Sequence, residues 1–498
     1  MPAPSFTRSS GVLLHPSSLP GPFGVGDLGP VAYRWVETLA AAKQSWWQIL
    51  PLGPTGFGDS PYQSFSAFAG NVNLLSPELL EEDGLIGGGY RDGLNFLDGE
   101  ADLDRVAPFK MALVREAFGR ANTRATEFAE YCKAQAIWLD TFAAFMAIRG
   151  AFGGATLADW PAEIRSRKPP ALAALTGEFA GEIRLHMFGQ FLFDRQWLAL
   201  RAFAAEQGVR VIGDLPIFVA ADSSDVWANP HQFLVDDQCS PLVVAGVPPD
   251  YFSEDGQHWG NPLYDWPAMA ADGFAWWRAR VRRCLEQADL VRLDHFRGFV
   301  QAWHIPAGEA TARNGTWVDG AGEPLFAALE KEFGSLPFIA EDLGLITPDV
   351  VALRLFHRLP GMCVLQFALG GAGNLYWPHN YEPNTAVYTG THDNDTTAGW
   401  YATLKDADRY TLLEYVGHPW HEPAWEAIRM AWASVAKLAI APLQDLLGLG
   451  SEARMNVPGK ADGNWRWRVT YEQFGPGMIE RLAGMTARYN RVPETVVE

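Results

Sequence analysis

Residues 290–296 read LVRLDHF, a short apolar run that ends in ionisable residues. Side chains alternate between the two faces of a strand, so this run, as a strand, places Arg292 and Asp294 on one face near its C-terminal end. Seven more apolar runs that end in polar residues are spread along the chain: GVLLHP (11–16), WWQILPLGP (46–54), VRVIGDLP (209–216), FIAEDLG (338–344), MCVLQFA (362–368), AVYTGTHD (386–393) and LAIAPLQD (438–445).

Helical patterns alternate with these runs. Val31, Trp35 and Leu39 recur at the helical period after Pro30, and Thr347 with the proline after it is typical of a helix start. Eight strands that alternate with amphipathic helices indicate a parallel sheet, and eight is the number that an eight-stranded α/β barrel requires. The predicted fold is therefore α/β, a single (β/α)8 TIM barrel over residues 1–498.

Two connections are too long for a simple barrel. A connection with its helix needs roughly 20 to 30 residues, and the segments 55–208 and 217–289 both exceed this length. We expect 55–208 to be an inserted, mostly helical subdomain and 217–289 to be an inserted loop and helical subdomain. Both leave from the C-terminal ends of strands, over the face where barrel active sites lie. The second includes the Gly- and Pro-rich segment 246–260, which we expect to be an active-site loop.

Composition excludes several classes of protein. The 498 residues carry a formal charge of −19, which repels nucleic acid phosphates and acidic lipids, so we expect neither as a partner. No apolar run approaches the ~18 residues needed to span a bilayer, and none near the N-terminus resembles a signal peptide. Four cysteines without a CxxC pair give neither a disulfide framework nor a zinc site. These features predict a cytoplasmic protein.

Cofactor motifs are weak or missing. Residues 24–29, GVGDLG, match GxGxxG, but a proline-rich stretch precedes them and no acidic residue follows about 20 positions on, so we interpret them as a loop. The sequence contains no P-loop, GxSxG or HExxH pattern. We therefore expect no cofactor, and no metal site is evident.

Ionisable residues end three of the predicted strands. Arg292 keeps Asp294 ionised, so this aspartate is either a nucleophile or half of a structural ion pair at the barrel mouth. Glu341 directly follows an apolar strand, where desolvation raises its pKa and suits it to be a general acid. Asp342 faces the other way and is expected to make a structural hydrogen bond, although spacing alone leaves the reverse assignment open. A third strand ends at His392 and Asp393, which either act in catalysis or belong to a loop that satisfies its own backbone.

Ionisable residues at three strand ends within about 100 residues are difficult to explain by structural roles alone, and they favour a catalytic site. Two carboxyl groups with opposed pKa values are the apparatus of retaining glycoside cleavage. The abundant aromatic residues, with 20 Trp among them, are compatible with sugar stacking.

Longer motifs narrow the assignment. The chain resembles the amylomaltases, the 4-α-glucanotransferases of glycoside hydrolase family 77 in the α-amylase superfamily, from residue 11 to beyond residue 460. One departure from other amylases is Leu-Pro-Ile-Phe after Asp214, which agrees with the amylomaltase pattern. The motifs that carry the resemblance are RLDHFRGF, AEDLG, TGTHDNDTT, GDSPYQSFSAFAGN, GDLPIFVAADSSDVW and GVPPDYFSEDGQHWGNPLYDW.

The resemblance implies a role for each matching residue. Asp294 is the expected nucleophile, Glu341 the acid/base and Asp393 the transition-state stabiliser. Substrate binding is expected from the remaining matched residues: Arg292, His392, Asp214, Ser60, Tyr62, Gln257 and Trp259.

The implied activity moves α-1,4-glucan segments from a donor to the 4-hydroxyl of an acceptor, by a retaining double displacement. Net disproportionation follows, with possible cyclisation. The implied substrates are malto-oligosaccharides and glucans derived from starch or glycogen, with glucose as an acceptor. The alternatives are an α-1,4-glucan hydrolase of the α-amylase type and a catalytically silent glucan-binding protein. A phosphate-handling barrel enzyme is disfavoured by the negative charge.

Overall fold

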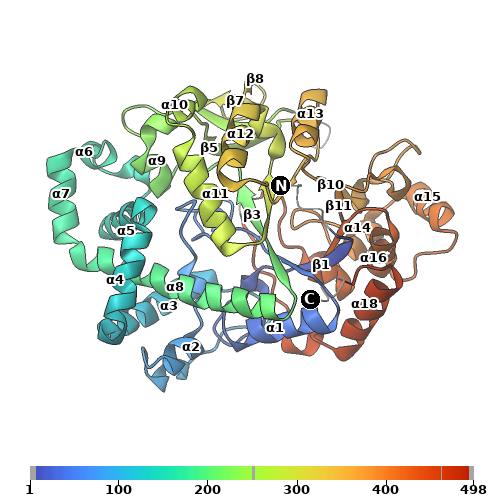
Figure 1. The fold of residues 1–498 in the computed structure, drawn as a ribbon, viewed down its shortest axis with the longest axis horizontal. Coiled ribbons are helices and arrows are strands. Elements are labelled where there is room, and N and C mark those ends of the chain that lie inside the picture. The colour runs from blue at the N-terminus through green and yellow to red at the C-terminus, as the bar shows by residue number, and fades with distance from the viewer. Residues whose placement is uncertain (1–6, 250–252, 461, 493–498) are drawn as a thin grey trace.

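The computed structural model describes residues 7–249, 253–460 and 462–492, and eight parallel strands lie at its centre (Figure 1). Their order in the sheet is β10-β11-β12-β1-β2-β3-β6-β9. Each strand overlaps one of the eight predicted runs. The strands are β1 (Ser9–Leu13), β2 (Trp46–Gln48), β3 (Arg210–Pro216), β6 (Leu290–Asp294), β9 (Phe338–Ala340), β10 (Gly361–Val364), β11 (Thr385–Tyr388) and β12 (Leu438–Pro442).

The sheet closes on itself where its two edge strands, β9 and β10, meet. The backbone N–H of Ala340 donates to the carbonyl of Pro360 at 2.9 Å, and the N–H of Met362 donates to the carboxylate of Asp342 at 2.8 Å. Closure removes the exposed strand edges, and it brings the carboxyl ends of all eight strands around one opening. The predicted (β/α)8 barrel is confirmed.

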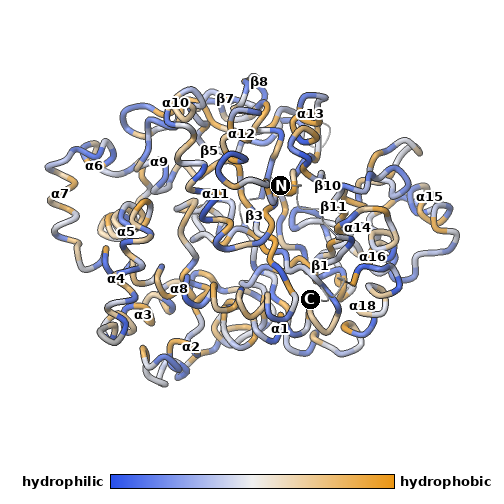
Figure 2. The backbone as a smooth tube through the Cα atoms, viewed as in Figure 1, coloured by the Kyte–Doolittle hydropathy of each residue, from blue (hydrophilic) through white to orange (hydrophobic). Residues whose placement is uncertain are grey.

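Large side chains fill the inside of the barrel. Trp46 is one of them, and Gly11 makes room for it, because a Cβ on Gly11 would lie 2.5 Å from the Cβ of Trp46. Higher in the barrel the hydroxyl of Tyr388 donates to the buried amide oxygen of Gln48 at 2.9 Å. The interior is thus a packed core that supports the opening above it. Figure 2 shows the hydropathy of the chain along these strands and the surrounding helices.

Amphipathic helices surround the strands. The predicted helix after Gly29 is α1 (Pro30–Ala41), which buries Trp35 and Leu39 as the pattern indicated. No helix of the described residues is long and apolar enough to cross a membrane. The α-helices from residue 275 onward are α11 (Ala275–Gln287), α12 (Gly322–Phe333), α13 (Pro348–Phe356), α14 (Thr397–Thr403), α15 (Asp406–Val416), α16 (Pro423–Ala433), α17 (Leu443–Leu446) and α18 (Pro476–Arg488).

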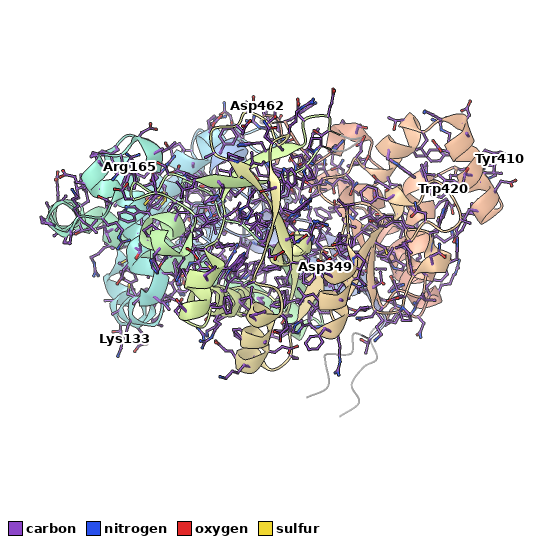
Figure 3. All side chains as sticks on the ribbon, turned by 90° about the horizontal axis from the view of Figure 1, so that it is seen from above. Lys133, Arg165, Asp349, Tyr410, Trp420 and Asp462 are labelled. Atoms are coloured by element: carbon purple, nitrogen blue, oxygen red, sulfur yellow. The ribbon has the colours of Figure 1, made fainter. Side chains whose placement is uncertain are left out.

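Residues 55–208 contain seven α-helices and no strand among the elements described. The long α8 packs against α1, so its end also serves the barrel. Figure 3 places Lys133 and Arg165 of this segment at one end of the molecule and Tyr410 at the other. The seven helices are α2 (Pro77–Glu82), α3 (Leu103–Gly119), α4 (Ala125–Ala134), α5 (Ala136–Ala151), α6 (Ala162–Arg165), α7 (Pro169–Glu178) and α8 (Ala180–Glu206).

Residues 217–289 contain strands that the sequence did not predict, beside the helices α9 (Ser224–Ala228) and α10 (Trp266–Ala271). The strands β4 (Val243–Val247) and β5 (Gln257–Pro262) pair antiparallel, and β4 also pairs with β7 (Gln301–Pro306), which pairs with β8 (Thr316–Asp319).

Gln257 and Trp259 therefore lie on a strand and not in a loop, which corrects the expectation for the end of segment 246–260. Residues 250–252 lie outside the described residues. The Gly and Pro content hid the alternation that marks a strand, and pairing with β4 supplies the order that local sequence lacks.

Candidate active site

Arg292 lies between two carboxylates at the top of the barrel. The parallel register of β3 and β6 places it opposite Asp214, and its Nη1 lies 2.8 Å and 3.0 Å from the two carboxylate oxygens of that residue. Its Nη2 lies 2.8 Å from Oδ1 of Asp294, which confirms that these two residues share a face. The side chain of Asp214 has no exposed surface, whereas that of Asp294 is 26% exposed. Only Asp294 of this pair is therefore open to a substrate.

The charges of this group support one another. Burial opposes the charge on Arg292, but the carboxylates of Asp214 and Asp294 outweigh it and raise the pKa of the guanidinium well above its ordinary value. Arg292 therefore stays charged. A permanent positive charge therefore lies in contact with the carboxylate of Asp294.

Glu341 directly follows β9, the strand next to β6. Its Oε2 accepts the backbone N–H of His295 at 2.7 Å and its Oε1 accepts that of Leu343 at 3.0 Å. Burial raises the pKa of Glu341 to about 8, and the charge of Asp294 adds to this effect while Arg292 opposes it. Glu341 is therefore mainly protonated at neutral pH, as a general acid must be.

Asp342 has the structural position that was expected of it. Its Oδ2 lies 2.9 Å from Nε of Arg354 on α13, and its Oδ1 accepts the N–H of Met362. Both contacts tie β9 to the next part of the barrel wall.

Tyr62 connects the first group to His392. Its hydroxyl donates to Oδ2 of Asp214 at 2.9 Å, and its ring stacks on the imidazole of His392, with centroids 5.0 Å apart and an interplanar angle of 17°. His392 is buried, and its Nε2 lies 3.4 Å from Oδ1 of Asp393. The side chain of Asp393 is 44% exposed, so its carboxylate also faces the open end of the barrel.

Two residues that sequence reasoning missed hold Asp393. Nδ2 of Asn456 donates to its Oδ1 at 2.6 Å, and Nη2 of Arg454 donates to its backbone carbonyl at 2.6 Å. The N–H of Asn456 also donates to the carbonyl of His392 at 3.1 Å. The one indication in the sequence was that both residues, in the motif RMN (454–456), come shortly after the eighth strand. Catalytic chemistry of this kind is expected of carboxylates, so an arginine and an amide were not selected.

The second sheet reaches the same opening through Trp259. Its ring meets the imidazole of His295 edge-on at 4.9 Å, and its Nε1 donates to Oε1 of Gln257 at 3.1 Å. Burial lowers the pKa of His295 to about 4, so this ring is neutral. On the other side, Oγ of Ser60 accepts the N–H of Tyr62 at 3.2 Å. These contacts connect all ten predicted site residues in one continuous group.

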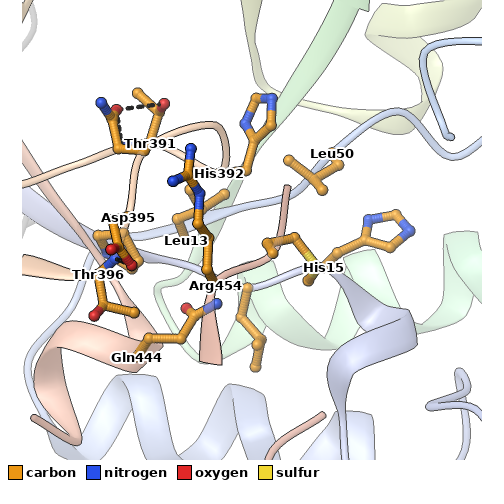
Figure 4. A pocket seen from close by; sticks show the side chains of 13 residues that line it. Leu13, His15, Leu50, Thr391, His392, Asp395, Thr396, Gln444 and Arg454 are labelled. Carbon is orange, nitrogen blue, oxygen red and sulfur yellow. Dashed lines mark hydrogen bonds between the residues drawn. The ribbon is translucent and has the colours of Figure 1, made fainter. Parts of the chain in front are cut away.

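Two pockets open next to this group. One is lined by Tyr62 and Asp214 together with Phe218. The other is lined by His392, His15 and Arg454 among others (Figure 4). Three of the predicted substrate-binding residues, Tyr62, Asp214 and His392, thus line these two pockets.

Comparison with known proteins agrees with this geometry. A family model described as 4-alpha-glucanotransferase matches residues 14–473. The chain is 47% identical to the 4-alpha-glucanotransferase of Thermus thermophilus, over 97% of this chain and 99% of the relative, and 47% identical to that of a Synechocystis strain, over 97% and 98%.

The structure superposes on amylomaltase from Streptococcus agalactiae in complex with acarbose, with a TM-score of 0.95, 36% identity and coverage of 97% of this chain and 99% of the other. Amylomaltase from Corynebacterium glutamicum, at 18% identity and a TM-score of 0.76 over 98% of this chain and 75% of the other, shares the fold. The resemblance of the sequence motifs is therefore confirmed, and the chain belongs to the 4-alpha-glucanotransferases of glycoside hydrolase family 77.

Proposed function

We propose that this enzyme transfers α-1,4-glucan segments by a retaining double displacement in which Asp294 is the nucleophile and Glu341 the acid/base. One observation carries the proposal: Asp294, paired with Arg292, ends β6, and Glu341 directly follows the neighbouring strand β9, where its carboxyl group accepts the backbone N–H of His295 beside Asp294. Burial raises the pKa of Glu341 to about 8, which favours its protonated form. Two carboxyl groups with opposed protonation states are what a retaining transfer needs.

In the first half of the reaction, a carboxylate oxygen of Asp294 attacks C1 of the sugar in the cleavage subsite. The bond from C1 to the glycosidic oxygen breaks, and Glu341 gives its proton to that oxygen. The products are a β-glucosyl ester on Asp294, a free glucan with a new 4-hydroxyl, and Glu341 as a carboxylate.

In the second half, the Glu341 carboxylate removes the proton from the 4-hydroxyl of an acceptor. The acceptor oxygen attacks C1, the ester bond to Asp294 breaks, and an α-1,4 bond forms. Asp294 leaves as a carboxylate next to Arg292, and Glu341 is protonated again, so the enzyme returns to its starting state.

Asp393 and His392 are proposed to bind hydroxyls of the sugar in the cleavage subsite, because both lie at the open end of the barrel and one carboxylate oxygen of Asp393 is oriented by Asn456. For Asp214 we revise the expected sugar contact. Its carboxylate is fully buried and engaged by Arg292 and Tyr62, which supports a role in holding these two residues.

Transfer instead of hydrolysis requires that water be kept from the ester intermediate. Trp259 lies on β5 with its ring against His295, the residue that follows the proposed nucleophile, and Gln257 of the same strand accepts the indole N–H of Trp259. We propose that an acceptor glucan stacks on Trp259 and displaces water there, so that a sugar hydroxyl reacts first.

The proposed substrates are malto-oligosaccharides and glucans from starch or glycogen, with glucose as an acceptor. The four cysteines are free thiols, which supports a reducing, cytoplasmic location.

The products from maltotriose test the proposal. A transferase gives glucose and a ladder of longer maltodextrins with an almost constant number of reducing ends. A steady rise in reducing ends marks the alternative, a hydrolase of the α-amylase type.

The roles of the two carboxyl groups can be tested separately with α-maltosyl fluoride as the donor and azide as a small nucleophile. The fluoride ion leaves C1 without being protonated, so the first step does not need the acid. Asp294→Gly should yield the β-azide, since azide occupies the place of the missing carboxylate. Glu341→Ala should yield the α-azide from the ester intermediate. The opposite pairing of variant and product contradicts the assignment.

A further inference from the structure

A buried carboxylate holds both ends of the loop that carries His392 and Asp393. Asp445 lies on the short helix α17, three residues after β12, and is 1% exposed. Its Oδ2 accepts the hydroxyl of Thr389 at 2.5 Å and that of Thr397 at 2.7 Å, and its Oδ1 accepts the N–H of Thr397 at 2.7 Å. Thr389 follows β11 and Thr397 begins α14, so a single side chain closes the loop of residues 389–397.

This carboxylate has no cationic partner among the ion pairs of the described residues, and the two threonines are fully buried with it. Burial raises the pKa of Asp445, and the hydrogen bonds from Thr389 and Thr397 oppose this rise. A buried charge without a counterion is costly and is tolerated where several donors satisfy it. Such a network has one low-energy geometry, which fixes the backbone at both threonines.

The rest of the loop is held at points between these ends. Nε2 of Gln366 donates to the carbonyl of Asp395 at 2.9 Å, and Oγ of Ser451 donates to the Asp395 carboxylate at 2.7 Å. None of the hydrogen bonds of Asp445 reaches His392 or Asp393 directly. Any influence of Asp445 on these two residues therefore passes through the loop backbone.

We infer that Asp445 is a positioning residue of the transfer reaction, which sets the places of His392 and Asp393 by joining the two ends of their loop. The inference rests on the proposed roles of His392 and Asp393. A displacement of about 1 Å in such groups costs up to about 100-fold in rate. The misplaced groups bind the distorted sugar of the transition state, so the loss should fall on kcat more than on KM.

Two substitutions separate geometry from charge. In Asp445→Asn the amide oxygen can still accept the N–H of Thr397, and the amide NH2 can donate to hydroxyls that then act as acceptors. This variant keeps the loop closed without the negative charge. Asp445→Leu has a similar size and removes the acceptor of the Thr397 N–H and of both threonine hydroxyls, and the Thr397 hydroxyl keeps only the amide of Gln366 at 3.4 Å as a donor to it.

The experiment measures kcat and KM with maltotriose well below the melting temperature of each full-length variant. Asp445→Leu should lower kcat by roughly 10- to 100-fold, and Asp445→Asn should restore it to within about threefold of the wild type. Gln196→Leu is the matched control, because the buried amide of Gln196 holds the backbone of Ser76 in the helical segment, at 2.7 Å and 3.2 Å. It should lower the melting temperature and leave kcat unchanged.

Three results overturn the inference: wild-type kcat in Asp445→Leu, an equal loss in Asp445→Asn and Asp445→Leu, or an equal loss in Gln196→Leu. If Asp445→Leu does not fold, Thr389→Val and Thr397→Val each remove one hydroxyl donor from the network. Both should then lower kcat, and wild-type kcat in both overturns the inference. Full activity of Asp393→Asn would instead show that the role proposed for Asp393 is wrong, which distinguishes this failure from a failure of the inference about Asp445.

Discussion

The backbone N–H of His295 donates a 2.7 Å hydrogen bond to Oε2 of Glu341. His295 follows Asp294 and has a left-handed backbone, with φ of 52°, at the turn after β6. The donor is thus part of the main chain beside the nucleophile. Strand pairing and one backbone turn therefore set the position of the proposed nucleophile relative to the proposed acid. Because these are main-chain features, rotation of side chains changes this relative position little.

The roles proposed for Asp294 and Glu341 predict retention at the anomeric carbon. Retaining enzymes hold their two carboxyl groups about 5 to 5.5 Å apart, with no room for a water between them, whereas inverting enzymes need roughly 6.5 to 9.5 Å. Proton NMR of the first products from maltotriose should show new glycosidic linkages in the α configuration only, because transfer creates no new reducing end. Early accumulation of β-linked product would exclude the double displacement.

Asp294→Asn should lower kcat by roughly 10⁴-fold or more, because the amide is a poor nucleophile for C1. Asparagine has nearly the same shape, so the affinity for maltotriose should change little. Calorimetric titration with maltotriose measures affinity, and the product ladder measures turnover. Substantial remaining turnover would mean that another group attacks the sugar.

The rate should fall above about pH 8 as Glu341 loses the proton that it gives to the leaving oxygen. The pH profile of kcat/KM for maltotriose provides this measurement. Glu341→Gln should lower kcat/KM by roughly 10²- to 10⁴-fold and remove this alkaline limb from any remaining activity. An alkaline limb that persists unchanged in Glu341→Gln would belong to a different group.

The same substitution should stabilise the protein in a defined pH window. Between the ordinary value of 4.5 and about 8, the unfolded chain ionises Glu341 while the folded chain keeps it protonated. The unfolded state therefore binds fewer protons, so stability is lost as pH rises through this window. The melting temperature of Glu341→Gln should exceed that of the wild type more at pH 8 than at pH 4.5. An equal difference at both values would contradict the raised pKa.

Asn456→Ala should weaken catalysis through Asp393. The substitution removes the 2.6 Å hydrogen bond to Oδ1, and a bond to a charged group contributes about 1.5 to 3 kcal/mol, or roughly 10- to 100-fold in rate when the geometry depends on it. Asn456→Asp is a more stringent test, because it places a second carboxylate next to that of Asp393 and should lower the rate at least as much as Asn456→Ala. Steady-state kinetics with maltotriose checks both variants.

Trp259→Ala should shift the enzyme toward hydrolysis. Without the indole next to His295, an acceptor sugar loses its stacking surface and water gains access to the ester intermediate. The ratio of new reducing ends to glucose released from maltotriose should rise, while Trp259→Phe should keep most transfer. An unchanged ratio in Trp259→Ala would exclude a role for this residue in the choice between water and sugar.

The sequence by itself determined the barrel and the chemistry of its strand ends. The eight apolar runs were recognisable because buried parallel strands are short and continuously apolar, and this property is local. Period-two alternation placed Arg292 and Asp294 on one face, and Glu341 was marked by its position directly after an apolar run. The motif resemblance then indicated the family.

Only the tertiary structure decided the partners. The register of β3 against β6 brings Asp214 to Arg292 across 78 residues of sequence, and Asn456 reaches Asp393 from beyond the next strand of the barrel. Gln257 and Trp259 lie on a strand where the sequence predicted a loop, because the extended backbone there is stabilised by pairing with β4 and not by a local sequence pattern. Strand positions follow from local hydrophobicity, whereas contacts between strand ends depend on register and closure, which are properties of the whole barrel.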